Sequence, residues 1–555
     1  MDKIWLASYH DEIPEVLPAL GFKSLREIID HSFKEYADRP CYTNMGTTLT
    51  YSDLDRLSMQ FASYLQNSLG LVKGERVAIM LPNILQYPVV LCGIFRAGLV
   101  AVNVNPLYTA RELRHQLSDS GARCIVVLDN FACTLEEVIS DTAVDHVVTT
   151  QVGDLLKFPK GLIVNFVLKR IKKAVPAYSL PGSVTLRKAL NEGDKAAVSH
   201  VELGLADLAF LQYTGGTTGL SKGAMLSHRN MVSNVHQGLA WIGDTLGDKK
   251  DIVAITALPL YHIFSLQSNC LSIMVDGGEN ILITNPRDMP GFVKELSKHK
   301  FGYFTGVNTL FAGLLNTPGF AELDFSTLKI TIGGGMAVQE AVSNKWKEVT
   351  GQHITQAYGL TETSPGAIIN LPGSNEFTGS IGLPISSTDV TICDDDGNPL
   401  GIGEIGEICI RGPQVMEGYW QQPEETEKVM LPGGWFRTGD VGRMDEKGFV
   451  FIEDRKKDMI LVSGFNVYPN EIEGVAVELE GVLEAAAIGK ADEKSGEVVK
   501  LFVVRSDPSL TEEQVKIHCR ENLTGYKVPR FIEFRDDLPK TNVGKILRRE
   551  LRDEE

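Results

Sequence analysis

Residues 208–223 read LAFLQYTGGTTGLSKG, an apolar run that leads directly into glycines, threonines, a serine and a lysine. A short apolar run that ends in glycine is typical of a buried strand of an α/β sheet, where the loops at strand ends hold ligands. The glycines let backbone N–H groups close around an anion, the hydroxyls add donors, and Lys222 adds a positive charge. We therefore expect a strand followed by a polyphosphate-binding loop; the alternative is a flexible surface turn.

Two other nucleotide-binding patterns are disfavoured. The loop is not a Walker A motif, because Ser221 precedes Lys222 and Gly223 follows it. Residues 401–406 (GIGEIG) match the dinucleotide fingerprint, but they follow a polar turn and lead into a strand instead of opening a helix. We interpret them as a hairpin connection, which leaves no support for a nicotinamide or flavin site.

Three patterns follow one another along the chain. Up to about residue 380, apolar strands alternate with helix-length amphipathic stretches, which predicts an α/β unit with a parallel sheet. The expected strands span residues 77–80, 100–104, 124–128, 208–212 and 328–332, and the expected helices end at Phe95 or span 112–118. Short strands at 390–392 and 407–410, separated by turn clusters, then indicate a small antiparallel or barrel-like unit. Beyond residues 454–457 (DRKK), about a hundred residues carry their own helix and strand patterns, which places a domain boundary there.

Composition limits the class of protein. The 555 residues should hold more than one core, and 43% hydrophobic with 23% charged residues is typical of a folded protein. Because 54 Lys and Arg face 71 Asp and Glu, the net charge of −17 argues against a nucleic-acid partner. Eight cysteines without a CxxC pair favour a reducing cytoplasm. With no signal-peptide pattern and no clean apolar run of spanning length, we expect a soluble or peripheral protein.

One segment differs in charge from this acidic background. Residues 160–175 carry Lys169, Arg170, Lys172 and Lys173 among seven large apolar side chains. On a helical wheel most of the basic residues share one arc and leave a wide apolar face. A basic amphipathic helix is typical of a membrane-surface patch. The alternative is a helix that docks on the protein's own core and leaves its lysines solvated.

Four further motifs, taken with the loop after residue 212, carry a family resemblance. They are residues 358–363 (YGLTET), 435–440 (WFRTGD), 454–455 (DR) and 539–545 (PKTNVGK). In order and spacing they resemble the adenylate-forming superfamily of acyl-CoA synthetases, firefly luciferases and peptide-synthetase adenylation domains. Within it the chain is most similar to the bacterial long-chain fatty acid–CoA ligases, although Arg437 stands where a histidine is common, which bears on chain-length preference.

The resemblance implies both a fold and an activity. The fold is α/β: a large N-terminal domain, residues 1–456, of α/β sheet subdomains plus a small distorted β-barrel, and a small mobile α+β C-terminal domain, residues 457–555. The activity is ATP-dependent formation of an acyl adenylate and pyrophosphate from a long-chain fatty acid, followed by transfer of the acyl group to CoA, in fatty acid uptake and β-oxidation. Mg²⁺ is the implied cofactor. A cytoplasmic enzyme, peripherally bound to the inner face of the membrane, is implied, and a homo-oligomer is left open.

The resemblance also implies roles for individual residues. Tyr358 would stack on adenine, Asp440 would bind the ribose, and Arg455 would bind the ribose or a phosphate. The implied catalytic residues are Lys545, His262 and Thr361, and the implied nucleotide-binding residues are Thr214, Gly215, Gly216, Thr217, Thr218, Lys222, Gly333, Gly334, Gly335, Tyr358, Gly359, Thr361, Asp440 and Arg455. The remaining assignments are Glu362 as the metal ligand, Lys457 as the hinge, Gly464 on the CoA side, and Val307, Gly335 and Met336 beside the acyl tunnel.

Without the resemblance, five of these residues have a simpler structural interpretation. Glu362 could be a solvated carboxylate, Tyr358 a core tyrosine and His262 a structural histidine. Asp440 and Arg455 could each be half of a surface ion pair. At the level of the whole protein, the alternatives are a medium-chain or aryl acid–CoA ligase and a non-catalytic binder of nucleotide or lipid.

Overall fold

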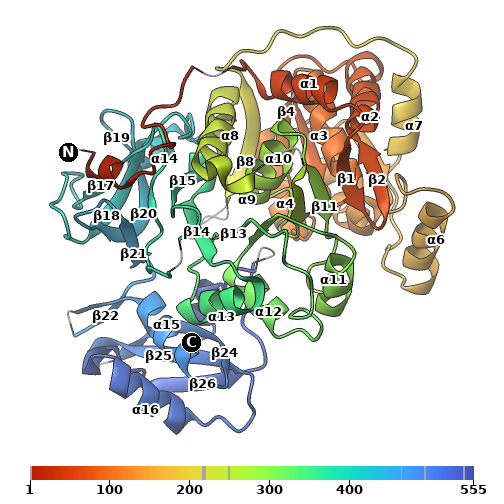
Figure 1. Cartoon of the computed structure of the whole chain (residues 1–555). Coiled ribbons are helices and arrows are strands. Elements are labelled where there is room, and N and C mark those ends of the chain that lie inside the picture. Colours follow the sequence, from red (N-terminus) through yellow and green to blue (C-terminus); the bar gives the residue numbers. More distant parts are fainter. Residues whose placement is uncertain are drawn as a thin grey trace.

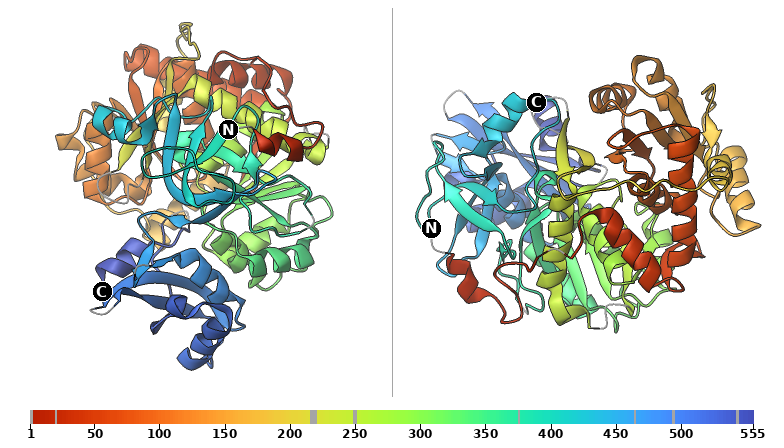
Figure 2. Two further views of the ribbon diagram at one scale, coloured as in Figure 1. Left: turned by 90° about the vertical axis from the view of Figure 1, so that its left-hand side faces the viewer. Right: turned by 90° about the horizontal axis from the view of Figure 1, so that it is seen from above.

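The computed structural model describes residues 3–19, 21–214, 221–247, 251–374, 376–463, 465–492, 495–541 and 544–555. These residues form four β-sheets. Three sheets and their helices make up a large body, and the fourth, with the helices near the C-terminus, forms a smaller body at one end of the molecule (Figure 1). The left view of Figure 2 shows the same separation from another side. The mixed α/β fold is therefore as expected.

A seven-stranded sheet contains the strand before the glycine-rich loop. Its order is β7 (Val184–Thr185), β6 (His146–Thr150), β5 (Cys124–Leu128), β3 (Arg76–Met80), β4 (Val100–Asn103), β8 (Leu208–Thr214) and β9 (Lys222–Ser227). All neighbouring strands are parallel except β8 and β9, which form a hairpin in which Thr214 pairs with Lys222. Thr214 and Lys222 are therefore neighbours where the two strands of this hairpin end.

A nine-stranded sheet lies beside it. Its order is β16 (Leu383–Pro384), β15 (Gly366–Ile369), β14 (Ile354–Gly359), β13 (Ile330–Gly334), β12 (Tyr303–Gly306), β10 (Val253–Thr256), β11 (Glu279–Leu282), β1 (Pro40–Asn44) and β2 (Thr47–Thr50). The strands from β14 to β1 are parallel, so the carboxyl ends of β12, β13 and β14 meet at one edge. In doubly wound folds such an edge is where ligands bind.

Helices cover both sheets. They are α1 (Leu25–Glu35), α2 (Tyr51–Ser63), α3 (Gln86–Arg96), α4 (Ala110–Ser120), α5 (Ala132–Glu136), α7 (Leu186–Gly193), α8 (His228–Ile242), α9 (Ile263–Ser265), α10 (Ser272–Val275), α11 (Met289–Leu296), α12 (Asn308–Leu315) and α13 (Glu340–Thr350). Local sequence sets several of their starts. Ser227 and Asn230 form a capping box, so α8 begins directly where β9 ends.

The third sheet is antiparallel, as the short strands predicted. It contains β17 (Asp389–Cys393), β18 (Gly406–Arg411), β19 (Met430–Leu431), β20 (Trp435–Met444) and β21 (Val450–Arg455), with α14 (Pro423–Val429) beside it. Because β17 and β18 are antiparallel neighbours, residues 401–406 lead from one to the other. The prediction that the GIGEIG pattern is a hairpin connection is confirmed.

The C-terminal body is α+β. Its sheet contains β22 (Ile460–Val462), β23 (Phe465–Val467), β24 (Val482–Asp492), β25 (Gly496–Arg505) and β26 (Phe531–Arg535), and its helices are α15 (Pro469–Glu478), α16 (Glu512–Asn522) and α17 (Arg548–Asp553). It has its own clusters of buried apolar side chains. The predicted boundary at residues 456/457 falls in the connection between β21 and β22 and stays a prediction.

The basic segment lies at the periphery of the large body (Figure 1). It forms α6 (Lys160–Phe166) and a π-helical turn, η5 (Val167–Ile171), so the helical part ends before residue 175. Val164 and Leu168 pack partly against the core. Five large apolar side chains are exposed by 57% to 85%: Phe158, Leu162, Ile163, Phe166 and Ile171. Across the described residues, no helix has both the length and the apolarity needed to cross a bilayer.

Candidate active site

A cavity of about 750 Å³ lies where the carboxyl ends of β13 and β14 meet the β8–β9 hairpin. Twelve predicted site residues line it: Thr214, Lys222, His262, Val307, Gly334, Gly335, Tyr358, Gly359, Thr361, Glu362, Arg455 and Lys545. An adjoining cavity of about 380 Å³ is lined by Gly333, Met336 and Asp440, and shares Gly335, Tyr358, Gly359, Arg455 and Lys545 with the first. Gly215, Gly216, Thr217, Thr218 and Gly464 lie outside the described residues.

Tyr358, Asp440 and Arg455 form one connected group. The Tyr358 hydroxyl donates a hydrogen bond to Oδ2 of Asp440 at 2.7 Å, and Nε of Arg455 lies 3.1 Å from Oδ1 of the same carboxylate. Asp440 and Arg455 face each other across the β20–β21 pair, and Asp440 is 4% exposed. The ion pair is therefore in the site and not on the surface.

Glu362 is enclosed at the end of β14. It lies in the 3₁₀ turn η9 (Thr361–Thr363), is 7% exposed, and accepts a hydrogen bond on Oε1 from the Tyr419 hydroxyl at 2.8 Å. Burial raises the pKa of the Glu362 carboxyl, although the Tyr419 hydrogen bond opposes that rise. A buried carboxylate beside a large cavity is a suitable oxygen ligand for a hard divalent cation.

Lys222 has partners that the sequence did not reveal. Its ammonium group forms an ion pair with Glu425 of α14 and lies 5.1 Å from the centre of the Tyr419 ring. The hydrogen bond from Lys222 lowers the pKa of Glu425 to about 2, with a second contribution from Lys428. Tyr419 and Glu425 both line the cavity, yet neither belongs to a motif recognised in the sequence. His115, on α4, also lines it and contacts the carbonyl of Ser221 at 2.8 Å.

Two of the three consecutive glycines serve packing. A Cβ on Gly333 would lie 2.6 Å from Cγ2 of Ile354, and a Cβ on Gly334 would lie 2.7 Å from the carbonyl oxygen of Ala357. Both contacts are with the neighbouring strand β14, so these glycines let two strands and their side chains approach closely. Gly335 has a φ of +78°, a conformation that residues with a side chain rarely adopt.

His262 caps the short helix α9. Its Nδ1 accepts a hydrogen bond from the Phe264 N–H at 3.3 Å. Burial, together with the charge of Lys545, lowers the pKa of His262 to about 4. The imidazole is therefore neutral at pH 7, and it can accept or donate hydrogen bonds in the cavity without adding charge.

Lys545 reaches the cavity from the C-terminal body. The carbonyl oxygen of the preceding residue, Gly544, accepts a hydrogen bond from Oγ1 of Thr309 on α12 at 3.0 Å. Burial, together with the positive charge of Arg455, lowers the pKa of Lys545 to about 7. The described conformation thus combines the Lys545 ammonium group with Arg455 and His262 around one cavity.

One ion-pair group crosses the connection at Lys457. Arg548, on α17, contacts Asp454 of β21 at 3.0 Å and Glu473 of α15 at 2.7 Å. Asp454 is 1% exposed, and its other oxygen accepts a hydrogen bond from the Asn470 N–H at 2.9 Å. Asp454 therefore holds two groups that follow Lys457 in the chain.

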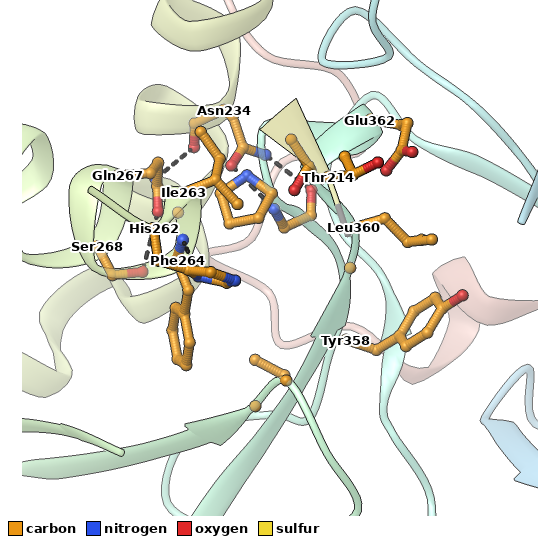
Figure 3. Close-up of a pocket in the computed structure, with 18 of the residues that line it drawn as sticks. Thr214, Asn234, His262, Ile263, Phe264, Gln267, Ser268, Tyr358, Leu360 and Glu362 are labelled. Atoms are coloured by element: carbon orange, nitrogen blue, oxygen red, sulfur yellow. Dashed lines mark hydrogen bonds between the residues drawn. The ribbon is translucent and has the colours of Figure 1, made fainter. Parts of the chain in front are cut away.

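Polar side chains lie on two opposite sides of the cavity, and apolar side chains form other parts of its wall. In Figure 3, Tyr358 and Glu362 lie on one side and Gln267 and Ser268 on the other. The Gln267 side chain bonds through both ends of its amide: Nε2 donates to the backbone carbonyl oxygen of Asn234 at 3.1 Å, and Oε1 accepts from the Ser268 hydroxyl at 3.0 Å. Large apolar residues supply other parts of the wall: Trp241, Ile242, Leu258, Phe264 and Ile332.

Comparisons with known proteins agree over the whole chain. Residues 29–420 match the model of the AMP-binding enzyme family, and residues 471–545 match that of the AMP-binding enzyme C-terminal domain. Curated relatives named long-chain-fatty-acid–CoA ligase include one from Escherichia coli O157:H7, 55% identical over 100% of this chain and 98% of the relative. One from Haemophilus influenzae is 54% identical over 100% and 99%, and one from Bacillus subtilis is 37% identical over 100% and 98%.

Solved structures share the fold. The anthranilate CoA ligase AuaEII in complex with anthranoyl-AMP aligns with a TM-score of 0.85 at 25% identity, over 97% of this chain and 98% of that one. ATP-bound MatB from Rhodopseudomonas palustris aligns with a TM-score of 0.78 at 27% identity, over 95% and 98%. With both family models matched in the order of the sequence motifs, the chain belongs to the family of AMP-binding enzymes.

Proposed function

We propose that this chain is an ATP-dependent long-chain fatty acid–CoA ligase that forms acyl-CoA, AMP and pyrophosphate. The observation that carries the proposal is a single cavity in which Lys222, Glu362 and Lys545 lie together with a wall of large apolar side chains. One substrate with a carboxylate and a long hydrocarbon chain fits such a cavity. Full-length relatives that are 55% identical carry the same name.

In the first half-reaction, a carboxylate oxygen of the fatty acid attacks the α-phosphorus of ATP, and pyrophosphate leaves. Both reactants are anionic, so the site must neutralise charge as they approach. Lys222 and Lys545 would supply positive charge on two sides of the cavity, and Thr361 would donate a hydrogen bond to the α-phosphate. Neutral His262 would lie beside the reacting carboxylate.

The nucleotide would be held by the connected group at the β20–β21 pair. Tyr358 would stack on adenine, while Asp440 accepts hydrogen bonds from the ribose hydroxyls and Arg455 reaches the ribose or a phosphate. The hydrogen bond between Tyr358 and Asp440 fixes the orientation of both side chains before the nucleotide binds. Thr214 and the glycine-rich loop after it would contact the phosphates.

Glu362 fits the role of a Mg²⁺ ligand, because its carboxylate is buried against the cavity and the metal prefers oxygen ligands. Mg²⁺, when bound, would supply additional positive charge to the triphosphate. Tyr419 would orient Glu362 through its hydrogen bond at 2.8 Å.

In the second half-reaction, the CoA sulfur attacks the acyl carbonyl carbon, the thiol loses its proton, and AMP leaves. We propose that residues 457–555 rotate as a unit about Lys457 between the two steps, which removes Lys545 and brings the segment around Gly464 to the CoA side. The pose with Lys545 in the cavity would serve adenylate formation.

We further propose peripheral binding to the anionic, inner face of a membrane through α6 and η5. The exposed apolar side chains named above would enter the interface, and four exposed basic residues would contact lipid headgroups: Lys169, Arg170, Lys172 and Lys173. Long-chain fatty acids partition into membranes, so this position would place the enzyme close to its substrate.

The decisive experiment follows the two half-reactions separately. Pyrophosphate release should require ATP, Mg²⁺ and a long-chain fatty acid, and thioester should form only after CoA is added. Competition with benzoate or anthranilate tests the aryl alternative, since an aryl acid should compete weakly. The proposal fails if no fatty acid supports pyrophosphate release, or if an aryl acid is the preferred substrate.

A further inference from the structure

The cavity extends along the face of the nine-stranded sheet. Side chains of a strand alternate between its two faces, so residues two apart share one face. On β12 and its extension, Tyr303 and Val307 line the cavity; on β13, Ile332 and Gly334; and on β14, Thr355, Ala357 and Gly359. Each set has even spacing, and the two remaining lining residues, Gly335 and Tyr358, lie at the carboxyl ends of β13 and β14. One face of three neighbouring strands therefore forms a continuous floor.

The floor runs from Val307, at the carboxyl edge of the sheet, back to Tyr303. Val307 lies near the carboxyl edge, where a Cβ on Gly544 would be 3.2 Å from its Cγ2, directly before Lys545. Tyr303 lies four residues earlier, which at about 3.3 Å per residue places its Cα roughly 13 Å from that of Val307. A chain whose carboxylate lies near Lys545 would therefore run back along the floor toward Tyr303.

Three buried residues from separate elements close this end. Tyr303 begins β12, Ile242 ends α8 and Ser272 begins α10, and they are 2%, 7% and 5% exposed. The same three residues also line a second, very small cavity of about 10 Å³, whose other lining residues are Leu239, Leu246, Ile252, Ile273 and Asp276. They are thus a partition between the large cavity and a mostly apolar void beyond it.

Tyr303 is the bulkiest member of this partition. Burial raises the pKa of its hydroxyl, and the neighbouring Ser268 hydroxyl opposes that rise. Ser272 is held by the Gln267 amide, whose Nε2 lies 3.2 Å from its Oγ. Because the side chains of Ser268 and Ser272 are both bonded to Gln267, an alkyl chain can lie against them without leaving one of them newly unpaired.

We infer that Tyr303 sets the upper limit of acyl chain length, because its ring separates the acyl part of the cavity from the apolar void beyond. The inference rests on the proposed function and adds to it the residue that selects among fatty acids. Replacing the ring by a methyl group joins the two spaces. Each further methylene that becomes buried should then improve kcat/KM by about fourfold, the factor that corresponds to burial of one methylene.

The test measures kcat/KM for fatty-acid-dependent pyrophosphate release with octanoate, laurate, palmitate and arachidate in one detergent. In Tyr303→Ala, the ratio of kcat/KM for arachidate to that for octanoate should rise at least about tenfold over the wild type. Octanoate, which is too short to reach Tyr303, should be used within about threefold of the wild-type rate. Tyr303→Phe is the matched control: it keeps the ring, so the chain-length profile should stay unchanged.

Ile242→Ala removes another wall of the same partition and should shift the profile in the same direction. This second variant keeps the inference testable if loss of the Tyr303 ring prevents folding. Unchanged ratios in the folded alanine variants would overturn the inference, as would an equal shift in Tyr303→Phe, which would assign the effect to the hydroxyl. Absence of pyrophosphate release with every fatty acid in the wild type would instead refute the proposed function.

Discussion

Thr309 donates a hydrogen bond from Oγ1 to the carbonyl oxygen of Gly544, 3.0 Å away. The contact joins α12 of the large body to the turn that presents Lys545. Gly544 has a φ of +82°, and a Cβ added to it would lie 2.7 Å from the same Oγ1. The turn can therefore dock in this way only with glycine at position 544.

We predict that Gly544→Ala slows adenylate formation by at least about tenfold, because positive φ costs a side-chain-bearing residue roughly 1–2 kcal/mol and the new methyl group collides with Thr309. Conversion of a supplied acyl adenylate to acyl-CoA should stay within about threefold of wild type, since the proposed rotation would separate the two residues. Adding Thr309→Ala removes the collision but leaves the strain, so it should restore part of the rate. An equal rate in the single and double variants would contradict the docking contact.

Lys545→Ala should slow adenylate formation by at least about a hundredfold, as removal of an oriented electrostatic donor does. Thioester formation from acyl adenylate should be spared, because the proposed rotation would remove the lysine from the site before thiol attack. Pyrophosphate release and CoA consumption measure the two steps separately. Similar losses in both steps would show that Lys545 acts otherwise.

Adenylate formation should weaken as pH rises through about 7. The pKa of Lys545 is lowered to about 7 by burial and by Arg455, so the stabilising positive charge is present below that pH and lost above it. The pKa of His262 is about 4, so His262 stays neutral over this range and cannot cause the change. The pH profile of kcat/KM for ATP reports the free enzyme. Lys545→Arg keeps its charge, so its rate should not fall as pH rises through about 7. If the rate of this variant falls as in the wild type, another group is responsible for the pH dependence.

Lys457→Pro should retain much of adenylate formation but lose most thioester formation. Proline fixes φ near roughly −65°, which obstructs rotation about this position. Among the described residues no backbone hydrogen bond from the Lys457 N–H is found, so the substitution should leave the resting structure intact. Lys457→Ala is the matched control and should keep both steps. Unimpaired thioester formation in the proline variant would place the hinge elsewhere.

Charge reversal of Lys169, Arg170, Lys172 and Lys173 should weaken sedimentation with anionic vesicles and reduce the salt dependence of binding. Activity on a detergent-dispersed acid should survive, because these residues lie at the periphery. Phe166→Ser, which removes an exposed apolar side chain but no charge, should weaken vesicle binding with its salt dependence kept. Vesicle binding that is the same in all variants would exclude this surface.

Local patterns account for the parts of the fold that the sequence predicted. The strand expected at 124–128 is β5 over the same residues, and the helix expected at 112–118 is α4, longer by two residues at each end. The motif residues around Tyr358 and Gly334 come together because they lie at the carboxyl ends of neighbouring parallel strands. Periodicity and glycine position carry that information.

Long-range packing accounts for what was missed. Tyr419 contacts Glu362 across 57 positions and Glu425 contacts Lys222 across 203, and no periodic pattern links such pairs. The basic segment is helical only as far as Ile171, the last residue of a π-helical turn, and its composition does not mark that end. In the sequence, Tyr303 is likewise an ordinary strand residue. Only the fold shows that it lies at the closed end of the cavity.

In its ion pair with Glu425, Lys222 already has a counterion before any substrate binds. In the proposed mechanism a phosphate that reaches Lys222 would compete with this carboxylate, so nucleotide entry would be an exchange of anions and would yield less net attraction than an unpartnered ammonium group. The exchange also runs in reverse. When pyrophosphate departs, Glu425 would pair with the lysine again, so the product would leave without exposing an uncompensated charge.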